Sequence, residues 1–199
     1  MTRLLFIVAS LILVAAHDVA AQRKQTTAPG TADEIAIYQL LVDSIFTGRH
    51  TQAIVVADTA MSLAIPADSV YHVATRHLYP PVPREAIADF LAKNASPAPQ
   101  IAVRAKVPVH RISRRAFHRM IDGRPHDAAW AEFYRRFGNA TEMLVLSRIG
   151  FDAARRHALV DIRSYSHSYT TPHSGFVAHL ERGTDGEWKI VHWRLLWVR

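Results

Sequence analysis

Hydrophobic residues recur at helical spacing at the start of the chain beyond residue 30. Thr31 and Glu34 form a capping box, a signature with which helices begin. The apolar positions that follow are Ile35, Tyr38, Leu41, Val42 and Ile45. Their spacing of three or four residues predicts an amphipathic helix over about 32–47, ended by Gly48.

Two further elements are expected before residue 95. The β-branched run at 52–57 predicts a short buried strand. Pro80, Pro81 and Pro83 interrupt the chain and precede a second helix, which we expect at about 84–93.

The middle of the chain changes from alternating to helical patterning. Apolar side chains at every second position predict a strand at about 101–109, and Pro108 places it at an edge or an end of a sheet. Ser113 then caps a short helix that extends to Ile121. An aromatic face predicts a longer helix that ends at Gly138.

The last third of the chain is patterned as strands joined by short, turn-rich loops. The expected strands are 142–151, 158–169, 175–182 and 187–198. Short loops between neighbouring strands predict a four-stranded antiparallel meander over about 142–198. Helices that come first and strands that come last predict an α+β fold, with N-terminal helices packed on one face of a C-terminal antiparallel sheet. Residues 31–199 are expected to form a single domain.

The first residues of the sequence have the pattern of an export signal. The apolar run Leu4–Ala16 follows Arg3, and small residues lead up to Ala21. We expect a signal peptide at 1–21, cleavage near Ala21, a flexible linker at 22–30 and a periplasmic or secreted protein. The run is shorter than the roughly 20 residues that span a bilayer, so a retained anchor is the alternative, and no later transmembrane segment is expected.

Charge and cysteine content narrow the possible functions. The chain contains no cysteine, so neither disulfides nor thiolate metal sites can hold the fold. Its net charge is +7, and the basic excess lies within residues 101–156. This segment could bind a polyanion or an anionic membrane surface, or it could be a solvated basic face. The candidate residues for polyanion binding are Arg104, Lys106, Arg111, Arg114, Arg115 and Arg119.

Several short stretches occur in a consistent order from about residue 32 to the C-terminus. They are Tyr38 with Leu41, 55–59 (VVADT), 130–134 (WAEFY), 146–151 (LSRIGF), 158–160 (ALV), 186–189 (GEWK) and 197–198 (WV). Together they resemble a family of exported bacterial proteins that has no assigned function. The resemblance implies an exported α+β domain and no reaction. Members often carry cysteine-glycine motifs where this chain has Tyr165–Tyr169, so a redox or disulfide role is not implied.

Strand pairing predicts one cluster of polar side chains. If loop 183–186 pairs Arg182 with Glu187, and loop 170–174 pairs Tyr165 with His179, one face of the sheet collects several imidazoles, a phenol and a carboxylate. The cluster consists of Arg163, Tyr165, His167, His179, Glu181 and His192. It could be a ligand pocket, an acid–base site or the wet face of a half-buried sheet, and a one-residue slip would divide it.

No motif names a reaction. The sequence has no G-x-S-x-G turn and no HExxH, and its histidine spacings match no compact ligand motif, so we expect neither a metal nor a cofactor. The leading hypothesis is an exported domain, not an enzyme, that binds a small ligand or a protein partner. One alternative is an acid–base enzyme that uses His167, His179 or His192 beside Glu181. The other is a polyanion or membrane-surface binder.

Overall fold

The computed structural model describes residues 31–48, 50–62, 66–138, 140–167 and 173–198. The expected signal peptide, its cleavage near Ala21 and the linker at 22–30 lie outside these residues. In the part of the chain that is described, no helix has the length and apolarity that a membrane span requires.

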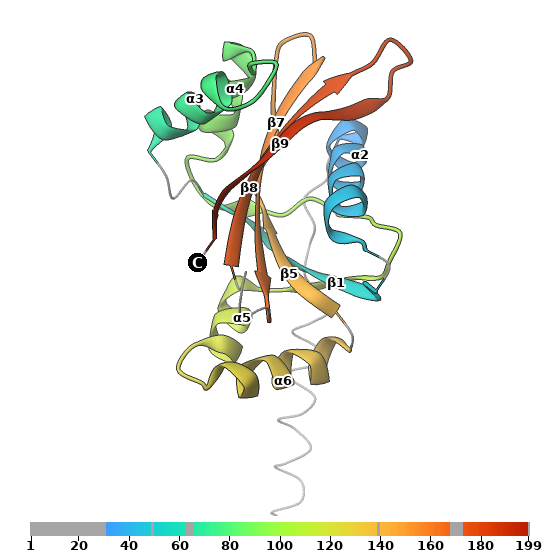
Figure 1. The fold of residues 1–199 in the computed structure, drawn as a ribbon, viewed down its shortest axis with the longest axis vertical. Helices are drawn as coiled ribbons and strands as arrows, with labels where there is room; N and C mark the ends of the chain where they lie inside the picture. Colours follow the sequence, from blue (N-terminus) through green and yellow to red (C-terminus); the bar gives the residue numbers. More distant parts are fainter. Residues whose placement is uncertain (1–30, 49, 63–65, 139, 168–172, 199) are drawn as a thin grey trace, which may run out of the picture.

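The protein has an α+β fold built on a seven-stranded mixed sheet (Figure 1). The helices are α2 (Ala32–Leu41), its π-helical extension η2 (Val42–Phe46), α3 (Ala67–Arg76), α4 (Arg84–Lys93), α5 (Arg114–Ile121) and α6 (His126–Phe137). The sheet strands are β1 (Ala53–Ala57), β4 (Val109–Ile112), β5 (Ala140–Leu146), β6 (Gly150–Phe151), β7 (His157–Ser166), β8 (His173–Arg182) and β9 (Trp188–Val198). A separate two-stranded ladder joins β2 (Thr59–Ala60) and β3 (Ala98–Pro99).

The C-terminal strands form the antiparallel meander that the sequence predicts. The spatial order is β4-β1-β5-β7-β8-β9, with β6 beside β7. Strands β5, β7, β8 and β9 pair antiparallel. Strand β1 pairs parallel with both β4 and β5, which makes the complete sheet mixed.

Local signals placed most helix ends correctly. The Thr31 hydroxyl accepts a hydrogen bond from the Glu34 amide at 3.3 Å, and the Glu34 carboxylate accepts one from the Thr31 amide at 3.0 Å, which confirms the capping box. Ser113 caps α5, Asn94 is the C-cap of α4, and Gly138 follows α6 with φ 61°. These ends are decided by contacts within a few residues of the chain.

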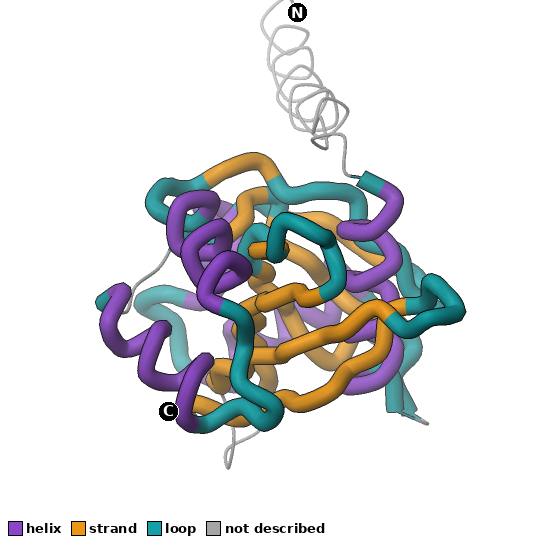
Figure 2. Tube along the Cα trace, turned by 90° about the horizontal axis from the view of Figure 1, so that it is seen from above, coloured by secondary structure: helices purple, strands orange, loops and turns teal. Residues whose placement is uncertain are grey.

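Helices cover both faces of the sheet, and the expectation of a single covered face was wrong. In Figure 1, α2 lies on one side of strands β7 to β9, and α3 and α4 lie on the other; Figure 2 shows the strands enclosed between helices. The reason is that the central strands are apolar at both odd and even positions. Leu144, Val160, Ala178 and Leu180 pack with α2, whereas Met143, Val145, Leu159 and Val177 pack with α3 to α6.

Two predicted strands were wrong in detail, and one helix was missed. The expected strand at 101–109 is absent up to residue 108: this segment packs alternate apolar side chains against the α2 cluster, and β4 begins only at Val109. The expected strand 142–151 is divided into β5 and β6 by residues 147–149. Helix α3 was not predicted, although its Val70 and Ala74 sides are buried at helical spacing.

The pairing registers also differ from the predicted ones. Tyr165 pairs with His173 and not with His179, a shift of six residues in β7 against β8. Arg182 pairs with Trp188 and not with Glu187, and an irregularity between His179 and Leu180 adds a second residue of shift in β9. At His179 the register is shifted by six residues against β7 and by two residues against β9. Because an even shift leaves side chains on the same face, the neighbours of His179 remain on the predicted face of the sheet.

Gly150 in β6 marks the place where helix α4 packs directly on the sheet. A Cβ atom at this position would collide with the side chain and amide of Phe90 and with the carbonyl of Ala86. Backbone atoms of a packed helix cannot turn aside as a flexible side chain would. The absence of a side chain at Gly150 therefore sets the distance between α4 and the sheet.

We expect Gly150→Ala to lower the free energy of unfolding by about 1–3 kcal/mol, because α4 must move away from β6. Urea denaturation measures the change. Gly48→Ala is the matched control, since the nearest atom to a Cβ there is 4.0 Å away. Equal stability of the two variants would contradict this account of the α4 packing.

Candidate functional site

The six residues of the predicted cluster lie on one sheet face but at three places along it. His167 lies beside α6, and Tyr165 contacts Phe117 of α5 with ring centroids 5.4 Å apart. Arg163 lies in the middle of β7, and His179, Glu181 and His192 lie near the loop between α3 and α4. The six-residue shift of β7 against β8 explains why they do not form a single pocket.

The first place is a compact group formed by His157, His179 and Glu181. His157 Nδ1 lies 3.3 Å from His179 Nε2 and 3.6 Å from Glu181 Oε1. His179 Nε2 lies 4.0 Å from the same carboxylate oxygen. Sequence reasoning missed His157 because the strand was expected to begin at 158. The available signal was its odd sequence position, which places its side chain on the same face of the strand as Asp161 and Arg163.

His179 is fully buried and its ring orientation is defined. Its Nδ1 lies 3.1 Å from the carbonyl oxygen of Pro80, which can only accept a hydrogen bond, so Nδ1 carries the proton. Burial lowers the pKa of His179, opposed by the charge of Glu181 and by the bond to Pro80. The imidazole is therefore neutral at pH 7, with the lone pair of Nε2 directed at His157 and Glu181.

His192 belongs to the same region but has a different partner. It lies opposite His179 in the β8–β9 pairing. Its Nδ1 accepts a hydrogen bond from the Tyr79 amide at 2.8 Å. Two histidines from neighbouring strands thus hold consecutive residues of the α3–α4 loop against the sheet.

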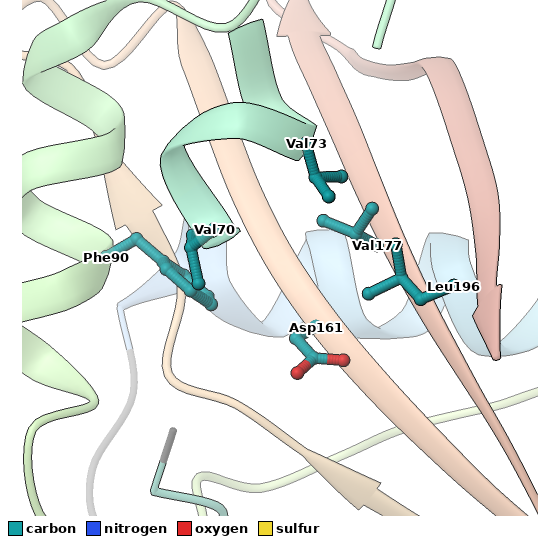
Figure 3. Close-up of a pocket in the computed structure, with 6 residues that line it drawn as sticks. All are labelled: Val70, Val73, Phe90, Asp161, Val177 and Leu196. Carbon is teal, nitrogen blue, oxygen red and sulfur yellow. The ribbon is translucent and has the colours of Figure 1, made fainter. Parts of the chain in front are cut away.

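The second place is a crevice around Asp161 (Figure 3). Its carboxyl group is surrounded by Val70, Val73, Phe90, Val177 and Leu196. The crevice holds about 10 Å³ of free space, at most enough for one water molecule. Burial raises the pKa of Asp161 to about 6, although Arg163 Nη2 lies 4.0 Å from the carboxylate. A carboxyl group of this kind can exchange a proton near neutral pH, but a substrate would have to displace α3 to reach it.

The third place, beside α6, contains His167. Its Nε2 lies 3.3 Å from Asp127 Oδ1, and its ring stacks on His126 with centroids 4.9 Å apart. Trp130 and Tyr134 flank the same ring. Asp127 is mostly exposed, with 75% of its side chain accessible, so this group is wetter than the one around His179.

An open groove that sequence reasoning missed lies on the opposite face, beyond the end of η2. It has a volume of about 250 Å³. Its polar lining consists of Glu142, Ser164, Ser166 and Ser174, and its apolar lining of Ile45, Phe46, Phe176, Trp193, Leu195 and Val198. The available signal was the row of polar residues at even positions of β7 and β8, where an apolar face was expected to continue.

The basic residues proposed to bind polyanions do not form one continuous surface. Lys106 lies near η2, where its amide donates to Asp43 at 2.7 Å, whereas α5 with Arg115 and Arg119 packs on the other side of the sheet. Arg111 is half-buried and donates to the carbonyl of Gln100 at 3.2 Å. Arg104 is exposed and Arg114 is half-buried.

Comparison of the chain with known protein families, with curated proteins and with solved structures yields no match.

The buried carboxyl of Asp161 predicts a specific pH dependence of stability. Its folded-state pKa of about 6 lies above the ordinary value of 3.8, so the folded protein holds this proton more tightly than the unfolded chain does. The stabilisation that this proton gives the folded protein is complete below about pH 4 and is lost as the pH rises through about 6. We expect the free energy of unfolding of the wild type to fall by about 3 kcal/mol from this cause, and that of Asp161→Asn not to show this fall.

Urea denaturation of both proteins at pH 4 and pH 8 measures this difference. Glu187→Gln, which removes an exposed carboxylate in the loop between β8 and β9, is the control for a general charge effect. If the free energy of unfolding changes equally with pH in the wild type and in Asp161→Asn, the raised pKa of Asp161 is contradicted.

Proposed function

We propose that this protein is an exported binding protein that holds a small amphipathic molecule in the groove beside η2. The single observation that carries the proposal is the combination, in one open pocket, of an apolar wall with a half-buried carboxyl group and three hydroxyls. Ligand pockets typically combine mostly apolar surfaces with a few convergent polar groups. The leader pattern at residues 1–21 supports export.

The polar end of the groove follows from the patterning of β5, β7 and β8. Ala158, Val160 and Ile162 face α2, but the same row continues as Ser164 and Ser166. Glu142 pairs with Ser166, and Ser174 pairs with Ser164. The sheet face therefore changes from apolar to polar where the helical cover ends, which creates a polar end inside an otherwise apolar depression.

The apolar wall comes from the edge strand β9. Trp193 is 46% exposed and Leu195 is 43% exposed, and both line the groove with Phe176 between them and the core. Phe176 is held in turn by Phe46 of η2, at a centroid distance of 5.8 Å. A contiguous exposed apolar surface of this kind marks an interaction site more often than isolated apolar residues do.

Glu142 determines the chemistry of the ligand that fits best. Burial raises the pKa of Glu142, and a hydrogen bond donated by the Ser164 hydroxyl opposes this shift. The carboxylate accepts hydrogen bonds and has no cation among the residues that line the groove. We therefore infer a ligand with an apolar body and a head group that donates hydrogen bonds, such as a hydroxyl or an ammonium group.

Decylamine, decanol and decanoate are suitable probes because they share one apolar chain and differ in the head group. We expect saturable binding in the order decylamine, decanol, decanoate, because Glu142 attracts the first head group and repels the last. Isothermal titration calorimetry measures the three affinities. In Glu142→Gln we expect decylamine to bind about tenfold more weakly, while decanol changes less.

Two further variants separate the groove from general surface effects. Leu195→Asp introduces a charge into the apolar wall and should weaken all three probes. Glu187→Gln makes the same charge change as Glu142→Gln at an exposed turn and should leave every affinity unchanged. Absence of saturable binding, or equal effects of Glu142→Gln and Glu187→Gln, would contradict the proposal.

A further inference from the structure

A second site is built on the opposite face of the sheet from the groove, by His157, His179 and Glu181. We infer that these three side chains bind a divalent transition-metal ion of the zinc class. The inference does not depend on the proposed ligand groove, since the two sites share no residue. It also differs from the expectation, drawn from histidine spacing, that the chain has no metal site.

Two of the three separations between the ligand atoms match those of a tetrahedral zinc site, and the third is slightly longer. Zinc binds imidazole nitrogen and carboxylate oxygen at roughly 2.0–2.2 Å, which places neighbouring ligand atoms about 3.3–3.6 Å apart. The observed separations from His157 Nδ1 are 3.3 Å to His179 Nε2 and 3.6 Å to Glu181 Oε1. The third separation, 4.0 Å between His179 Nε2 and Glu181 Oε1, needs only a small rotation of the partly exposed Glu181 side chain.

The sheet holds the ligands in place without a metal. His157 pairs directly with Glu181 across β7 and β8, and His179 lies two residues before Glu181 on the same face of β8. All three positions belong to hydrogen-bonded strands, so their backbones are fixed. Sites built on regular elements keep their geometry better than sites on loops.

His179 already has the outer partner that metal-binding histidines use. Its Nδ1–H donates to the carbonyl of Pro80, which leaves Nε2 free of a proton and directed at the other two ligands. A hydrogen bond from the second ring nitrogen is what orients metal-binding histidines in proteins. His179 is also fully buried, so solvent does not compete for its position.

The ligand set and its accessibility indicate which ion fits. Two imidazoles with one carboxylate suit zinc and its neighbours, whereas calcium and magnesium prefer oxygen ligands throughout. His157 and Glu181 keep 30% and 37% of their side-chain surface exposed, so an ion can enter from solvent and a fourth position remains for water. Lys189 lies opposite Glu181, but its ammonium group is bound to Asp185 at 2.8 Å.

A second group of two imidazoles and one carboxylate, formed by His126, Asp127 and His167, is less suited to an ion. Its two histidines approach one oxygen, Asp127 Oδ1, at 3.5 and 3.3 Å, as in the first group, but Asp127 is mostly exposed and His167 lies beyond the end of β7. His167→Ala is therefore the matched control for His157→Ala.

The test is titration of Zn²⁺ into the purified protein, without a histidine tag, by isothermal titration calorimetry. We expect saturable binding that His157→Ala and Glu181→Gln each weaken by at least about tenfold, since even partners of metal ligands change affinity 10–100-fold. Zn²⁺ should also raise the melting temperature of the wild type and not that of the two variants. His167→Ala and Glu187→Gln should bind like the wild type.

Co²⁺ gives an independent readout, because a tetrahedral nitrogen–oxygen site produces intense visible absorption that an adventitious surface ion does not. Glu181 is partly exposed and its replacement by Gln preserves shape, so this variant remains informative if His157→Ala does not fold. The inference is overturned if the wild type binds no Zn²⁺ saturably, or if neither His157→Ala nor Glu181→Gln weakens binding. Loss of binding in His167→Ala alone overturns it as well.

Discussion

The pairing of β7 with β8 is the constraint on which the rest of the structure depends. It places His157 opposite Glu181 and Ser164 opposite Ser174, and so defines one end of each of the two sites. Successive side chains on a strand point to opposite faces, so a single register decides both faces at once. A shift of β7 by one residue would turn Ser164 towards the α3 to α6 side of the sheet and His157 towards the α2 side, which would disrupt both sites.

The two sites occupy opposite faces because both faces of the central strands are covered, but neither is covered completely. On one face, α2 and η2 end before the sheet does, and the strands continue with polar side chains. On the other face, the loop between α3 and α4 closes over His179 and leaves His157 and Glu181 at its rim. Both proposed sites thus lie where helical cover ends, which is where an apolar interior and solvent-accessible polar groups meet.

Burial shifts Asp161, Glu142 and His179 toward their neutral forms. It raises the pKa values of Asp161 and Glu142 and lowers that of His179. In each case desolvation is the largest cause, and a nearby charge or hydrogen bond opposes it. The surroundings nevertheless differ: Asp161 lies among apolar side chains, Glu142 faces an open groove, and His179 is fixed by a carbonyl. The same physical effect, desolvation, therefore acts on these groups in three different surroundings.

Local patterning determined the elements whose ends are specified by their own neighbours. The capping box at Thr31, the cap at Ser113 and the glycine at 138 predicted helix ends correctly, and short turns predicted the antiparallel meander. Patterning also identified the polar sheet face that contains His179 and Glu181. It failed where distant segments decide: the β7–β8 register, the packing of 101–109 on α2, and the groove. These three features depend on which strands pair and on where the helices stop covering the sheet. The packing of the whole chain decides both, because side chains far apart in the sequence compete for the same buried surface.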